Sequence, residues 1–176
     1  TPEVCLLNSD VLSIQPGWLQ PLFRTRLMVP EAMVAPLLLT DEGRIQHAGM
    51  TAQTLGLGDL PAWVHSLKGL DPQQLKALSP DGLPYDVELL SGAALMFERK
   101  RFLELGGFNP GFGRGDFEGL DFSLRWRQAG GRLQRLPSAR LTHLERQSIT
   151  HQQDPLTQWR AVLNAWQAKQ LCPELA

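Results

Sequence analysis

The chain has 176 residues, a formal net charge of −1 at pH 7 and 43% hydrophobic residues. This length is enough for one domain with its own core, and the near-zero charge argues against a nucleic-acid-binding surface. Cys5 and Cys172 lie far apart in unlike surroundings, which argues against a disulfide framework or a zinc cluster and fits a reducing compartment. No apolar run reaches the length of a membrane span, and no signal peptide is visible.

The first element is a short apolar strand, Val4–Leu7, followed directly by Asn8, Ser9 and Asp10. Ligands of an open α/β sheet bind at the carboxyl ends of its strands, so these polar residues lie where a ligand-binding or catalytic site is expected. A divalent cation bound through a substrate diphosphate needs only one or two carboxylates, and Asp10 is a candidate for one of them. The simpler interpretation is an Asx-turn that closes a buried strand.

The next elements alternate between helix and strand. Trp18–Leu27 predicts a short amphipathic helix, Val34–Leu39 predicts a second apolar strand, and Arg44–Met50 predicts a third, short one. His47 lies in this third segment and could approach a ligand. We expect it to be a hydrogen-bonded structural residue instead, because that is the more common role of a lone histidine.

Glycine and proline residues interrupt the segment Thr51–Tyr85 repeatedly. The pattern predicts an irregular insertion with at most short helices near Ala62–Leu67 and Pro72–Leu78. Long loops of this kind are often functional, so a lid, a loop that faces the acceptor and a linker-like insertion all remain open.

Val87–Phe97 is the strongest strand candidate and contains small residues, including Gly92 and Ala93, at its centre. Small residues allow a ligand or a packed helix to approach the backbone closely, and both explanations stay open. One or two helical turns are then expected at Lys100–Leu105.

The segment Arg114–Gly130 concentrates acidic residues at the start of a predicted helix. Asp116 is a good candidate for its N-cap, and Glu118, Asp121 and Arg125 fall along one side. Asp121 and Arg125 can form an ion pair because they are four residues apart. The arrangement suits a site where a carboxylate meets a ligand, whereas the simpler interpretation is an ordinary capped helix with a solvated acidic first turn.

The chain then continues as an α/β protein. Leu133–Leu136 and Arg140–Leu144 predict two short strands separated by Pro137, and His143 lies near the end of the second. Asp154–Leu171 predicts a final helix, with Asp154 as its cap and Pro155 in its first turn.

Four phrases of the sequence together resemble one protein family. They are LLNSDV (Leu6–Val11), LLSGAALMFERKRFLELGGF (Leu89–Phe108), GRGDFEGLDFSLRWRQAG (Gly113–Gly130) and LTHLERQS (Leu141–Ser148). In this order they resemble the C-terminal part of a bacterial family-two glycosyltransferase, an inverting enzyme with the A-type fold. IQHAG (Ile45–Gly49) is similar to members of the rhamnosyltransferase kind. The resemblance implies an α/β fold in which helices flank a mixed sheet.

The resemblance also implies roles for individual residues. Asn8-Ser9-Asp10 matches the aspartate-any-aspartate motif, except that Asn8 replaces its first aspartate. The match implies that Asn8 and Asp10 lie at the nucleotide-sugar diphosphate and that Asp10 binds a Mn or Mg ion. His143 matches the histidine that completes the metal site, and Gly92-Ala93 matches the element where donor sugar and acceptor meet. Arg125 is a candidate for a positive charge on the leaving diphosphate.

The family's catalytic base is the aspartate of a glutamate-aspartate pair, and Gly119 stands in its place. An inverting transfer needs a carboxylate that removes the proton of the acceptor hydroxyl, so the base would be Glu118, Asp121 or Asp116. Glu118 is the first choice because it is adjacent and longer than aspartate. A Gly119→Asp substitution would be the natural restoration.

The implied protein is a metal-dependent transferase that moves a sugar from a nucleotide sugar to a glycan acceptor in bacterial polysaccharide biosynthesis. Residues 1–176 would form a single partial domain that lacks the N-terminal nucleotide-binding strands, so a missing half or a neighbouring domain is an expected partner. We expect a cytoplasmic protein, or one peripheral at the inner membrane face. The alternative is a degenerate, non-catalytic domain that binds glycan or a partner.

Overall fold

The structure is a computed structural model that describes residues 2–13, 15–55, 60–112 and 117–144, together with Asn164 and Trp166, and gives the backbone alone for 52–55 and 60–62. Its strands are β1 (Glu3–Leu7), β2 (Val11–Leu12), β3 (Ala32–Leu39), β4 (Ile45–His47), β5 (Met50–Leu55), β6 (Leu60–His65), β7 (Tyr85–Asp86), β8 (Ala94–Glu98) and β9 (Arg132–His143). Its helices are α1 (Leu19–Met28), the 3-10 helix η1 (Pro72–Ala77), α2 (Arg99–Glu104) and α3 (Glu118–Gln128).

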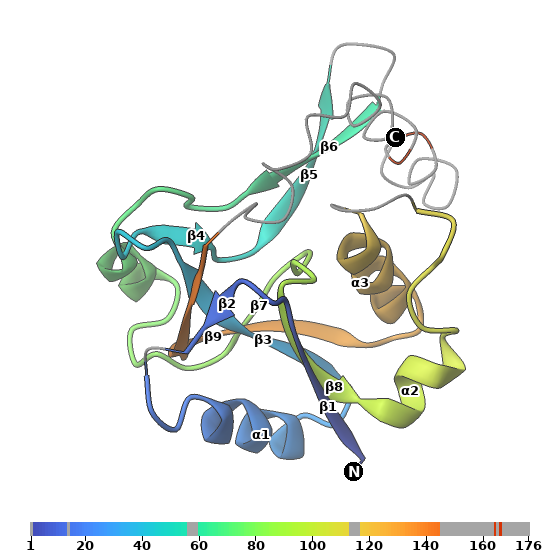
Figure 1. The fold of residues 1–176 in the computed structure, drawn as a ribbon, viewed down its shortest axis with the longest axis horizontal. Coiled ribbons are helices and arrows are strands. Elements are labelled where there is room, and N and C mark those ends of the chain that lie inside the picture. Colours follow the sequence, from blue (N-terminus) through green and yellow to red (C-terminus); the bar gives the residue numbers. More distant parts are fainter. Residues whose placement is uncertain are drawn as a thin grey trace.

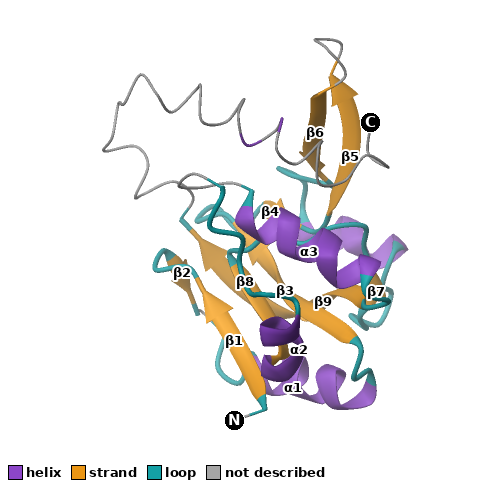
Figure 2. Ribbon diagram, turned by 90° about the vertical axis from the view of Figure 1, so that its right-hand side faces the viewer, coloured by secondary structure: helices purple, strands orange, loops and turns teal. Residues whose placement is uncertain are grey.

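A mixed sheet forms the centre of the molecule (Figure 1). Its strand order is β1-β8-β3-β9-β2, with β4 added to β3 and β7 added to β9. β3 and β9 are parallel, whereas every other pair in the sheet is antiparallel. This arrangement confirms the expected α/β class with a mixed sheet. β5 and β6 form a separate hairpin that stands out from the body of the molecule, as Figures 1 and 2 both show.

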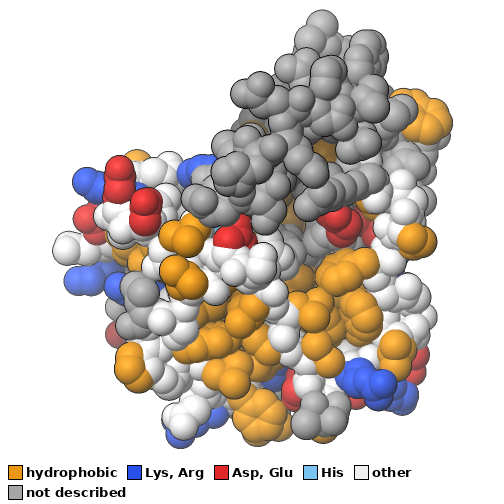
Figure 3. Space-filling model, viewed as in Figure 1, with side chains coloured by type: hydrophobic (Ala, Val, Ile, Leu, Met, Phe, Trp, Pro, Cys, Tyr) orange, Lys and Arg blue, Asp and Glu red, His pale blue; other side chains and the backbone are white. Residues whose placement is uncertain are grey.

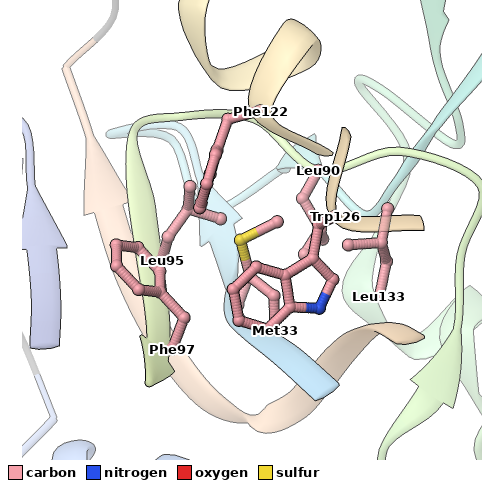
Figure 4. Packing of buried hydrophobic residues seen from close by; sticks show 8 residues of the cluster. Met33, Leu90, Leu95, Phe97, Phe122, Trp126 and Leu133 are labelled. Atoms are coloured by element: carbon pink, nitrogen blue, oxygen red, sulfur yellow. The ribbon is translucent and has the colours of Figure 1, made fainter. Parts of the chain in front are cut away.

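Helices cover both faces of the sheet because the side chains of β3 alternate between two apolar clusters. Met33 and Ala35 contribute to a cluster with Phe122 and Trp126 of α3, shown in Figure 4. The intervening residues, Ala32 and Val34, pack with Leu22 of α1 instead. All eight residues of β3 are buried, so this strand lies at the centre of the core.

Pro36 interrupts the pairing of β3 with β9. Pro36 is opposite Leu136, but the next residue, Leu37, is opposite Arg140, so β9 contains three extra residues at this point. Proline has no N–H to donate to a ladder and is tolerated in sheets at such irregularities. The two short strands expected around Pro137 are therefore one bulged strand, and the prediction of two was wrong.

The segment Thr51–Tyr85 contains more regular structure than expected. The short helix predicted near Pro72–Leu78 is confirmed as η1, whereas the one predicted near Ala62–Leu67 is wrong because residues up to His65 belong to β6. Pairing with β5 supplies the hydrogen bonds of β6, which local sequence cannot reveal.

The strand predicted at Val87–Phe97 begins only at Ala94. The backbone before it turns away, because the carbonyl of Leu89 accepts a hydrogen bond of 3.1 Å from the N–H of Met50. Gly92 and Ala93 then form a turn. The first half of the strand prediction was wrong for this reason.

The helix predictions agree with the structure at α1, α2 and α3, except at one cap. The N-cap of α3 is Phe117, and its side chain makes no capping hydrogen bond. Asp116, the expected cap, lies outside the described residues. The predicted helix Asp154–Leu171 also lies outside them, apart from Asn164 and Trp166, which are helical. Among the described residues, no helix is both long and apolar enough to cross a membrane.

Candidate functional site

The Asn8-Ser9-Asp10 turn lies between β1 and β2, at the carboxyl end of β1. The N–H of Asn8 donates to the carbonyl of Ala93 at 2.9 Å, and the carbonyl of Asn8 accepts from the N–H of Val11 at 3.1 Å. The carbonyl of Asp10 accepts from the N–H of Leu144 at 3.0 Å. These backbone bonds hold the turn between the start of β8 and the end of β9.

The structure brings Asp10 and His143 together, although they lie at opposite ends of the described chain. Val11 is paired with His143 in the β2–β9 ladder. Asp10 Oδ1 lies 3.2 Å from His143 Nε2, and the two side chains are only 14% and 11% exposed. His143 Nδ1 is buried with no hydrogen-bond partner among the described residues.

This pair fits a divalent cation. Two ligand atoms about 2.1 Å from an octahedral ion, at right angles to each other, stand about 3 Å apart, close to the observed separation. Carboxylate oxygen and imidazole nitrogen both ligate such ions. The described residues contain no cluster of three or more potential ligands, so further ligands would have to come from elsewhere.

Gly92 and Gly119 form a close backbone contact between the loop before β8 and the first turn of α3. A Cβ atom added to Gly119 would overlap with the backbone N and Cα of Gly92, and one added to Gly92 would lie 3.1 Å from Gly119 Cα. Glycine is required where two backbones approach so closely. Close packing against Gly92 therefore explains why residue 119 is a glycine, and a Gly119→Asp substitution would disrupt this contact.

Asp121 and Arg125 form the ion pair that their spacing predicted. Arg125 Nε and Nη2 donate to Asp121 Oδ2 at 2.9 and 2.5 Å, and the Asp121 side chain is 3% exposed. Arg125 Nη1 also donates to the carbonyl of Leu105 at 2.6 Å, and Nη2 donates to that of Gly107 at 2.8 Å. Arg125 thus ties α3 to the turn that follows α2, and Asp121 holds the guanidinium group of Arg125 in place.

Two of the remaining predicted residues, Ala93 and Glu118, are next to Gly92 and Gly119 in the sequence. Glu118 is the first residue of α3 and is half-buried beside Gly119. Ala93 is 3% exposed, so the packing explanation of the small residues fits better than direct contact with a ligand. Asp116 lies outside the described residues. The structure therefore brings Asp10 to His143 and bonds Asn8 to Ala93, whereas Glu118 joins this region through the contact of Gly119 with Gly92.

Ser91 and Ser123, neither of which was predicted as a site residue, hold the loop before β8 in place. Ser123 Oγ of α3 donates to the carbonyl of Leu90 at 3.1 Å and accepts from its N–H at 3.4 Å. The N–H of Ser91 donates to Nε2 of the fully buried His47 at 3.0 Å. His47 is thus a hydrogen-bonded internal residue, as expected. No local pattern could have revealed these contacts, because they join segments distant in sequence.

Comparisons with known proteins agree with the glycosyltransferase resemblance. No protein-family model matches the chain. The chain is 28% identical over 134 residues to putative polypeptide N-acetylgalactosaminyltransferase 13 of Drosophila melanogaster, covering 76% of this chain and 23% of the relative. It is 28% identical over 159 residues to polypeptide N-acetylgalactosaminyltransferase 15 of Mus musculus, covering 88% and 24%.

A bacterial relative and a solved structure extend the comparison. The chain is 31% identical over 153 residues to the uncharacterized protein y4gI of Sinorhizobium fredii, covering 86% of this chain and 16% of that protein. The crystal structure of GalNAc-T7 with UDP, GalNAc and Mn²⁺ matches with a TM-score of 0.59 and 21% identity, covering 81% of this chain and 27% of that one. The chain thus spans about a quarter or less of the length of these proteins.

These likenesses show that the chain has the fold of an A-type glycosyltransferase. They support the glycosyltransferase resemblance at this coarser level. The narrower likeness to bacterial rhamnosyltransferases gains no support from them.

The Gly92–Gly119 contact generates a testable prediction about stability. Alanine ordinarily stabilises a helix relative to glycine, but Gly119→Ala should destabilise this protein by about 1–3 kcal/mol because the new methyl group overlaps with Gly92. Urea unfolding measures the effect. Gly92→Ala is the matched control and should cost less, since its Cβ meets only a tight contact. A Gly119→Ala variant as stable as the wild type would contradict the contact.

Proposed function

We propose that this chain forms the metal-binding side of a glycosyltransferase that moves a sugar from a nucleotide-diphosphate donor to an acceptor. The observation that carries this proposal is the Asp10–His143 pair, which lies on an A-type glycosyltransferase fold at the end of β1. Two relatives are named as N-acetylgalactosaminyltransferases, and the structural neighbour was solved with UDP, GalNAc and Mn²⁺.

Asp10 and His143 would hold a Mn or Mg ion, and the donor diphosphate would supply further oxygen ligands. Bound there, the ion would stabilise negative charge on the leaving diphosphate. Asn8 would contribute by fixing the turn that presents Asp10. Gly92 and Ala93 would act through their backbones. Ala93 would hold the turn through its bond to Asn8, and Gly92 would fix the position of α3 through its contact with Gly119.

Binding of the metal and the nucleotide tests this proposal. In the natural full-length protein we expect Mn²⁺ to bind and to strengthen the binding of a nucleoside diphosphate, as measured by calorimetric titration across a panel of nucleotides. Asp10→Asn should weaken Mn²⁺ binding by at least about tenfold, because it removes a charged ligand. Asp81→Asn changes an exposed aspartate and should leave binding unchanged. A folded protein that binds neither Mn²⁺ nor any nucleotide would contradict the proposal.

We further propose that transfer proceeds with inversion and that Glu118 is the base. Glu118 lies beside the Gly92–Gly119 contact, whereas the carboxylate of Asp121 is buried against Arg125. A positioned base typically accelerates such a proton transfer by 10² to 10⁴.

Product analysis tests this assignment. Glu118→Gln should lower kcat by at least about a hundredfold while donor binding is retained, and NMR of the wild-type product should show an inverted anomeric centre. A product with retained configuration would remove the need for a base and contradict this assignment, while leaving the metal site intact.

A non-catalytic binding domain is the second candidate. The buried Asp121–Arg125 ion pair favours this second candidate, because the carboxylate of Asp121 is held by Arg125 and is not free to act as a base. The same titrations separate the two candidates. Nucleotide-sugar binding without any transfer to an acceptor would support the binding domain, and turnover would exclude it.

In the part of the chain that the structure describes, β1 pairs with β8 along one edge and with no strand along the other. The Asn8–Ala93 and Arg99–Pro2 hydrogen bonds show that the backbone N–H and C=O groups of even-numbered residues in β1 point toward β8. Because these groups alternate along an antiparallel strand, those of Cys5 and Leu7 point away from β8. Hydrophobic side chains gather over this side of the molecule in Figure 3, and Leu7 and Leu12 are 45% and 46% exposed. We propose that a strand from another part of the same protein pairs with β1.

Hydrogen exchange tests this pairing in the natural full-length protein. We expect the amides of Cys5 and Leu7 to be as strongly protected as those of Val4 and Leu6, which already bond to β8. Fast exchange at Cys5 and Leu7 alone would mean that the edge is open and would contradict the proposed partner strand.

A further inference from the structure

Three segments that are distant in sequence meet at His47. Its side chain is fully buried at the end of β4. Nε2 accepts a hydrogen bond of 3.0 Å from the N–H of Ser91, in the loop before β8. Nδ1 lies 2.9 Å from Nδ1 of His65, at the end of β6, and the two rings meet edge to face.

These contacts define the protonation state of His47. Because Nε2 accepts a hydrogen bond from a backbone N–H, its lone pair must be free and the proton must reside on Nδ1. Nδ1–H then donates to His65 Nδ1. Burial lowers the pKa of His47 well below its usual 6.5, and the neighbouring charges of Arg135, His65, His143 and Lys68 lower it further. His47 is therefore a fixed, neutral acceptor.

A series of hydrogen bonds continues from Ser91 to the candidate metal site. Ser91 Oγ accepts from the N–H of Ala93 at 3.3 Å, and the carbonyl of Ala93 accepts from the N–H of Asn8 at 2.9 Å. Asn8 begins the turn that contains Asp10. Gly92, between the two bonded residues of the loop, rests on Gly119 of α3. A displacement of Ser91 would therefore move both the turn and the contact with α3.

We propose that His47 is a positioning residue that holds the Ser91–Ala93 loop and, through it, the Asn8-Ser9-Asp10 turn. Its effect on sugar transfer rests on the proposed function, whereas its effect on the loop does not. The bond to His65 selects the tautomer that accepts from Ser91. The base of the β5–β6 hairpin is thereby coupled to the candidate metal site.

The test compares two amide side chains of different reach. His47→Gln places its amide oxygen near the position of Nε2 and keeps an acceptor for Ser91, whereas His47→Asn reaches only the position of Nδ1. Hydrogen exchange is measured at single-amide resolution in the natural full-length protein. The amides of Ser91 and Asn8 should both exchange at least about tenfold faster in His47→Asn and near the wild-type rate in His47→Gln.

The exchange result can overturn the proposal in two ways. Unchanged rates in His47→Asn would show that His47 does not hold the loop. Faster exchange at Ser91 with an unchanged rate at Asn8 would show that the turn is not coupled to it. The core amide of Val34 serves as the internal control and should stay protected in both variants, because the change is local.

A measurement on the wild type keeps the proposal falsifiable if His47→Asn does not fold. The nitrogen NMR spectrum should show His47 with a protonated Nδ1 and a bare Nε2 at pH 7. A protonated Nε2 could not accept from Ser91 and would overturn the proposal.

Kinetics separate this proposal from the proposed function. In a protein that transfers sugar, kcat/KM should fall at least about tenfold in His47→Asn and recover in His47→Gln. A natural protein without transferase activity would overturn the proposed function, while the exchange rates would still decide the role of His47.

Discussion

The candidate site depends on a contact between two glycine backbones. Gly92 and Gly119 approach so closely that a side chain on Gly119 could not be accommodated without a shift of the backbone. The first turn of α3 can therefore lie directly on the loop that precedes β8. Ser123 then fastens the helix to Leu90, and Arg125 fastens it to the turn after α2. The position of Glu118 relative to Asp10 follows from this contact.

Much of the fold could be predicted from local sequence. β1 and β3 were expected because each is a short apolar run, and α1 was expected from an amphipathic helical pattern. Their bounds agree with the prediction to within one or two residues. The errors arose where distant pairing overrides local pattern. β6 is a strand because β5 lies beside it, and β9 is continuous because its three extra residues bulge opposite Pro36.

The contacts of the candidate site also fall into two groups, those that local sequence spacing predicts and those that depend on distant strand pairing. The Asp121–Arg125 pair is local and follows from a spacing of four residues along a helix. The approach of Asp10 to His143 depends on β2 pairing with β9, so composition and spacing could not indicate it, and only the family resemblance did. Gly119 was interpreted as the loss of a catalytic side chain, because its packing role requires knowledge of which backbone lies opposite.

The strand order also has a consequence for synthesis of the protein. β3 is eight buried residues long, and β4, which pairs with its end, follows it directly in the chain. The two strands that flank β3 in the sheet order, β8 and β9, are made much later. At a ribosomal rate of roughly 5–20 residues per second, β3 waits on the order of 5–20 seconds for β9 to be completed. During that time its apolar side chains have only part of their final contacts, those with α1 and with the β4 region. Pro36, at its centre, opposes pairing with the strands of other nascent chains, since proline is unfavourable in aggregating β-segments.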